Sequence, residues 1–189
     1  MRAQILTLGQ LVLATSLVLM PWASAQAACD GEPWISLEIV AGEIAGDALA
    51  EFVEIDREGC VLSFYPEFDL RAGLYERQLS RGERQALSDA VVGSRALEFD
   101  PAALRARQQQ RAQPIEAGGQ GQLYYVAGAD LVKLRINADN AEQLIEWPSP
   151  ELYADLMVDD VPLRKLADLI KRIRVEGADP RRSRTGVQP

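Results

Sequence analysis

The sequence predicts an α+β fold, in which an antiparallel sheet of about four to five strands has helices packed on one face. Segments that alternate apolar and polar residues, a pattern typical of half-buried strands, occur in both halves of the chain. Segments with helix-start signals follow the strands of each half. This order of strands and helices favours a sheet that is covered by helices on one side.

The strands of the first half are separated by clear turn signals. We expect strands at residues 34–40, 53–55 and 60–64, with 75–79 either a further short strand or an extended approach to the next helix. Residues 56–59 are four polar residues that end in glycine, and they predict a hairpin turn. Gly59 can take the left-handed conformation that a β-carbon disfavours.

Two helices are predicted between the strands of the two halves. Ser80 and Glu83 have the spacing of a capping box, so a helix begins there, buries one apolar face and ends near Ser94. The buried residues of this helix are expected to be Leu87, Ala90 and Val91. Asp100-Pro101 begins a second helix, which runs to about Arg111 and has little apolar surface beyond Leu104.

The second half predicts a hairpin followed by two helices. Residues 123–126 and 131–136 are expected to pair around a turn at 127–130. Helix starts are indicated at Ser149-Pro150 and at Asp160-Val161-Pro162. The last helix carries an apolar stripe of Leu163, Leu166, Leu169, Ile170 and Ile173.

The chain begins with the three parts of a secretory signal peptide. Arg2 provides a positive n-region, residues 11–20 form an apolar stretch too short to span a bilayer, and Ala23-Ser24-Ala25 offers a cleavage site. We therefore expect residues 1–25 to be a cleaved signal, 26–176 a single α+β domain and 177–189 a disordered basic tail. The expected location is the periplasm or the extracellular space, and the mature chain has no other segment apolar enough to span a membrane.

Two alternatives concern how the exported chain is held. The apolar stretch could be retained as an anchor, although its length disfavours this. Cys29 lies just past the cleavage region and could be lipidated, but Gln26 stands where a lipoprotein signal carries a Leu-like residue. In an oxidising compartment we expect Cys29 and Cys60, the two cysteines of the chain, to form a structural disulfide.

Composition excludes several classes of function. The formal net charge is −8, and removal of Arg2 makes it more negative, so the domain is not expected to bind nucleic acid. The absence of histidine excludes Ser-His-Asp and Cys-His catalysis and imidazole metal sites. No nucleotide-binding or nucleophile-elbow motif is present, and no cofactor or metal site is assigned.

Carboxylate chemistry remains open. Glu54 and Asp56 are close in the first hairpin and could flank a scissile bond, but a solvated outer strand face explains them more simply. Residues 137–140 and Asp159-Asp160 supply oxygen ligands without matching a calcium-loop motif, and helix capping explains Asn140 and Asp160 more simply.

The leading hypothesis is a non-enzymatic envelope protein that binds another protein or a cell-wall ligand, with an inhibitor-like role included. Aromatic residues at loops would be its binding anchors, namely Tyr65, Phe68, Trp147 and Tyr153. One alternative is a carboxylate-dependent hydrolase that acts on a cell-wall or glycan substrate. The other is a membrane-surface accessory protein that uses the bases between Lys171 and Arg184. No motif is specific enough to assign the chain to a family.

Overall fold

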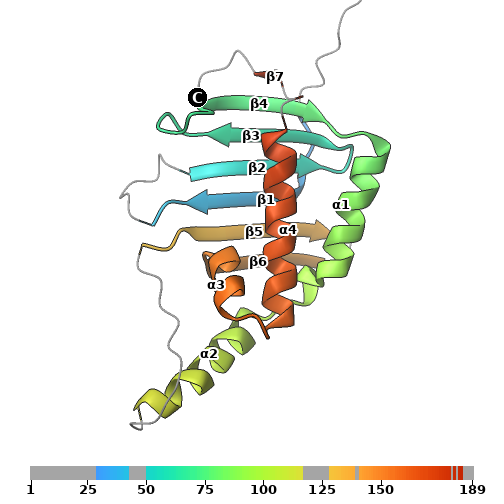
Figure 1. The fold of residues 1–189 in the computed structure, drawn as a ribbon. Helices are drawn as coiled ribbons and strands as arrows, with labels where there is room; N and C mark the ends of the chain where they lie inside the picture. The colour runs from blue at the N-terminus through green and yellow to red at the C-terminus, as the bar shows by residue number, and fades with distance from the viewer. Residues whose placement is uncertain are drawn as a thin grey trace, which may run out of the picture.

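The computed structural model describes residues 29–42, 50–116, 128–138, 141–179, 181 and 183–184. It confirms the α+β class, because an antiparallel sheet carries helices on one face (Figure 1). The strands are β1 (Pro33–Val40), β2 (Ala50–Asp56), β3 (Cys60–Tyr65), β4 (Gly73–Gln78), β5 (Leu131–Ala138), β6 (Ala141–Pro148) and β7 (Ser183–Arg184). The helices are α1 (Arg81–Ser94), the 3₁₀ turn η2 (Ala96–Glu98), α2 (Pro101–Glu116), α3 (Pro150–Leu156) and α4 (Val161–Ala178).

The strands lie in the order β6-β5-β1-β2-β3-β4-β7, and all neighbours are antiparallel. After β4 the chain passes through α1, η2 and α2 before β5 joins the sheet on the other side of β1. The described part of the chain therefore has six strands of full length, and the two-residue β7 extends the edge at β4. The predicted number of strands was slightly too low.

The additional strand is β6, and it corrects the predicted second hairpin. β5 pairs with β6 on one side and with β1 on the other. Both hydrogen-bonding edges of β5 are therefore occupied by described strands, and residues 123–126 lie outside the described residues. The predicted capping role of Asn140 is also wrong, because a strand and not a helix begins at Ala141.

One hydrophobic core lies between the sheet and the helices. α4 runs across the strands, and α1 lies beside it (Figure 1). The five residues of the predicted α4 stripe are all buried, as are Leu87 and Val91 of α1. They pack over buried strand residues such as Ile35, Val53 and Leu134. α2 contributes Leu104 to this core and otherwise extends away from the body (Figure 1), as its sequence predicts.

Local signals determine where the two long helices begin. The Ser80 side chain accepts a hydrogen bond from the Glu83 amide at 3.3 Å, and the Glu83 carboxylate accepts one from the Ser80 amide at 2.7 Å, which confirms the capping box. Asp160 accepts from the Leu163 amide at 3.1 Å and caps α4, also as expected. α1 ends at Ser94, and the residue in the left-handed conformation is Arg95.

The predicted disulfide between Cys29 and Cys60 is present, with a Cα–Cα distance of 5.5 Å. It joins the first described residue to the start of β3, and it is consistent with an exported protein. The predicted signal, residues 1–25, lies outside the described residues. No helix of the described ranges is long and apolar enough to cross a membrane.

The end of the chain is attached more closely than its composition predicts. α4 continues to Ala178, and Ser183–Arg184 pairs with β4, within the segment 177–189 for which we expected disorder. Residues 180, 182 and 185–189 lie outside the described residues. At the end of α4 the Gly177 carbonyl accepts a hydrogen bond from Ser63 Oγ at 3.0 Å, which joins the end of the helix to β3.

Candidate functional site

Three of the four aromatic residues proposed as binding anchors lie in the interior. Tyr65 is 0% exposed, Trp147 2% and Tyr153 7%. Trp147 and Tyr153 meet edge to face with their ring centroids 6.5 Å apart, so they pack against each other in the core. Phe68, in the turn between β3 and β4, is 58% exposed and is available to a partner.

The two carboxylates proposed for hydrolysis do not lie in one cavity. Glu54 lines a hollow of about 380 Å³ on the side of the sheet away from the helices. Asp56 is buried, its Oδ1 accepts a hydrogen bond from the Cys60 amide at 2.7 Å, and it lines a different cavity beside α1. Glu54 is therefore a residue of the outer sheet face, as the simpler interpretation holds, whereas Asp56 stabilises the hairpin turn.

Of the other candidate oxygen ligands, Asp160 has structural partners. The Asp160 carboxylate caps α4, and its Oδ2 also accepts a hydrogen bond from Arg107 Nε at 2.8 Å. Asp139 and Asn140 lie outside the described residues. In the part of the chain that the structure describes, no group of three or more acidic or cysteine side chains could hold a metal ion.

Several of the bases between Lys171 and Arg184, on which the membrane-surface hypothesis rests, are engaged in ion pairs. Arg172 contacts Glu176 at 2.9 Å, Arg174 contacts Glu151 at 3.0 Å, and Arg181 contacts Asp179 at 2.6 Å. A membrane surface would have to compete with these intramolecular carboxylates for the same guanidinium groups.

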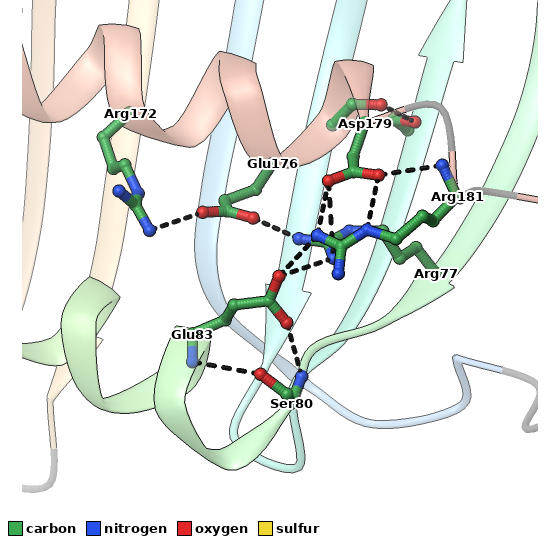
Figure 2. Close-up of polar contacts among 9 residues, drawn as sticks. Arg77, Ser80, Glu83, Arg172, Glu176, Asp179 and Arg181 are labelled. Atoms are coloured by element: carbon green, nitrogen blue, oxygen red, sulfur yellow. Dashed lines mark hydrogen bonds and ion pairs between the residues drawn. The ribbon is translucent and has the colours of Figure 1, made fainter.

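The sheet edge at β4 holds a cluster of charges that the sequence analysis missed (Figure 2). Its centre is Arg77 of β4, whose side chain is only 4% exposed and which contacts Glu176 of α4, itself 5% exposed. The Arg77 guanidinium also lies 3.1 Å from Glu83 of α1 and 3.7 Å from Asp179. We call these residues, with Arg172 and Arg181, the Arg77 cluster.

The carboxylates of the Arg77 cluster accept hydrogen bonds from groups of the same chain. Hydrogen bonds from the Ser80 hydroxyl and amide, followed by those from Arg181 and Arg77, hold the pKa of Glu83 far below its usual range. Hydrogen bonds from Arg181 do the same for the pKa of Asp179. The three acids and three arginines of the cluster balance one another in formal charge. The cluster joins β4, the start of α1 and the end of α4.

A sequence signal for Arg77 existed. Arg77 is two residues from Tyr75 and two from Leu79, so these three side chains lie on the same face of the strand. A charged residue therefore occupies a position of β4 that faces the helices. Its partners follow at positions 83 and 176–181, and no local pattern connects them.

The surface most available to a partner is the face of the sheet opposite the helices, which we call the open face. Among the described residues, all the helices that pack on the sheet lie on the other side (Figure 1). One half of the open face is apolar: Phe52 and Phe64 stack with ring centroids 5.5 Å apart, and Leu62 and Leu74 occupy neighbouring outward positions.

The other half of the open face is charged and hollow. Lys133 Nζ lies 3.1 Å from Glu38, and both line the hollow of about 380 Å³ that also contains Glu54 and Arg135. Leu144 of β6 is 45% exposed at its margin. An apolar centre with an aromatic pair beside a charged, solvated margin is the usual anatomy of a protein interface.

No family model, curated protein or solved structure matches the chain, so the geometry alone supports a functional assignment.

Proposed function

We propose that the chain is a non-enzymatic binding protein of the cell envelope that holds a partner protein on its open face. The observation that carries the proposal is the stacked pair Phe52–Phe64, half-buried on a sheet face that the described helices leave uncovered. Stacked aromatics of this kind are frequent anchors of binding energy, because they bury much area at a small cost in side-chain entropy.

The charged margin of the open face defines the chemistry of the partner. Carboxylates outnumber bases around the hollow, where Glu32, Glu38, Glu54 and Glu146 surround Lys133 and Arg135. A partner with basic side chains around an apolar centre would complement this surface. The signal-like N-terminus and the disulfide support an envelope location for the encounter.

The hydrolase alternative has little geometric support. It rested on Glu54 and Asp56, and these residues line different cavities on opposite sides of the sheet. The membrane-surface alternative rested on arginines, three of which contact carboxylates of the same chain.

The test is capture of partners from a native envelope extract by the immobilised mature protein, followed by chemical cross-linking. We expect a protein retained by the wild type to be lost with Phe64→Ala, and its cross-links to map to the open face. Val92→Ala is the matched control, because Val92 is an exposed apolar residue of α1 on the helix side. Retention that is equal for both variants, with both folded by circular dichroism, would reject the open face as the binding surface.

A further inference from the structure

A second cavity, on the helix side, has the composition of a ligand site. It measures about 350 Å³ and lies between the first hairpin and α1. Trp34 and Arg57 line it from the sheet, and Arg81, Arg84, Gln85 and Ser88 line it from the helix. We call it the Trp34 pocket.

The Trp34 pocket is basic, although the protein as a whole is acidic. Three guanidinium groups line it against one carboxylate, that of Asp56, and Asp56 Oδ1 already accepts the Cys60 amide. Arg57 donates from Nη2 to the Asn137 carbonyl at 3.0 Å, which fixes the position of its side chain. Clustered guanidiniums at a concave site attract an oxyanion, to which Arg81 and Arg84 can donate in a bidentate manner.

Arg84 is held in place without being neutralised. Its methylene groups pack on Gly59, where an added β-carbon would lie 2.3 Å from Arg84 Cδ. Its Nε is buried and has no hydrogen-bond partner. Among the described residues, neither Arg81 nor Arg84 forms an ion pair or side-chain hydrogen bond. The outer donors of these two guanidinium groups are therefore available to an acceptor bound in the pocket.

Trp34 adds an apolar wall to this basic cavity. The register between β1 and β2 shifts between Pro33 and Ile35, so Trp34 sits at an irregularity of the strand and packs against the core while lining the pocket. An indole face beside hydrogen-bond donors suits a ring with an apolar face and a charged substituent.

We propose that the Trp34 pocket binds a saccharide that carries a carboxylate or a phosphate. The oxyanion contacts Arg81 and Arg84, and the sugar ring lies against Trp34, with Gln85 and Ser88 as further polar contacts. This pocket and the open face are on opposite sides of the sheet, so one ligand does not compete with the other. The proposal does not depend on the identity of a protein partner.

The experiment is a titration of the mature protein followed by tryptophan fluorescence, with glucuronate, glucose 6-phosphate, glucose and inorganic phosphate as probes at constant ionic strength. After residue 25 the chain has two tryptophans, and Trp147 is buried, so a saturable change reports mainly on Trp34. We expect saturation with glucuronate or glucose 6-phosphate, which distinguishes carboxylate from phosphate recognition, and none with glucose.

Three variants make the titration decisive. Arg84→Met keeps the aliphatic packing on Gly59 and should weaken binding about tenfold or more, because a charge-assisted hydrogen bond is lost. Arg164→Met, an exposed position of α4 outside the pocket, should bind as the wild type does. Trp34→Phe should remove most of the fluorescence change, with binding then followed by calorimetry.

Two results would overturn the proposal. One is the absence of saturation with both anionic sugars, or saturation that Arg84→Met leaves unchanged. The other is an equal affinity for inorganic phosphate and glucose 6-phosphate. The sugar ring would then add nothing to binding, and the contact assigned to Trp34 would be wrong. Neither result would affect partner capture by the open face, so the two proposals fail independently.

Discussion

Removal of the Arg77 side chain should destabilise the domain strongly. Arg77 and Glu176 are almost fully buried, and Arg77→Met would leave the Glu176 carboxylate with only Arg172, at 2.9 Å, as a counter-charge. Breaking a buried pair by removing one partner costs about 3–5 kcal/mol. The lower end, about 3 kcal/mol, is expected here because Arg172 remains and because Glu83 and Asp179 are partly solvated. This is a large part of the roughly 5–15 kcal/mol that stabilises a domain.

The double variant Arg77→Met/Glu176→Leu separates the charge effect from a packing defect. It removes both members of the buried pair, so most of the lost stability should return. Urea denaturation followed by circular dichroism measures the free energy of unfolding of each variant. Arg95→Met is the matched control: Arg95 pairs with Glu98 at the surface, where the side chains are 68% and 62% exposed, and the change should stay within about 0.5 kcal/mol.

The interpretation would be refuted by either of two outcomes. A loss below about 1 kcal/mol for Arg77→Met would show that the cluster behaves as a surface pair. A double variant less stable than Arg77→Met would show that the apolar part of Glu176, and not its charge, is what the core requires.

Three further predictions concern stability. The pKa values of Glu83 and Asp179 are lowered in the folded protein, so these two carboxylates contribute fully to the free energy of unfolding above the unfolded-state pKa of about 4. This contribution should be lost as the pH falls toward the folded-state pKa values. Urea denaturation at a series of pH values between 7 and 2 measures the loss. Gly177→Ala should cost about 1–3 kcal/mol in the free energy of unfolding, since its β-carbon would lie 2.6 Å from Val53 Cγ2, whereas Gly93→Ala meets nothing within 4 Å and should be neutral or stabilising. Replacing both cysteines by serine should lower the free energy of unfolding by roughly 3–4 kcal/mol, and an unchanged denaturation midpoint would contradict this.

Much of the fold followed from short-range signals. The capping residues Ser80 and Asp160 act within one helical turn, so their effect is visible in the sequence. The left-handed Gly59, with φ of 87°, confirms the predicted hairpin turn for the same reason. β6 was missed although Ile145 and Trp147 alternate with polar residues, because the exposed Leu144 interrupts the pattern.

The candidate sites were harder to predict from the sequence than the fold, because they depend on which side chains the tertiary structure encloses. Residue type alone did not separate the buried Tyr65 from the exposed Phe68, since that difference arises from which side chains α4 and the sheet enclose. Glu54 and Asp56 are two residues apart, yet the turn and the register shift against β1 place them beside different cavities.

The sequence by itself determined the α+β class, the covered face of the sheet, the main helix starts and the pairing of the two cysteines, because each depends on local periodicity, capping or simple counting. Only the tertiary structure decided which charges meet in the Arg77 cluster and which side chains surround the Trp34 pocket. These sites join residues separated by up to about a hundred positions, and chain folding, not sequence spacing, sets the distances between them.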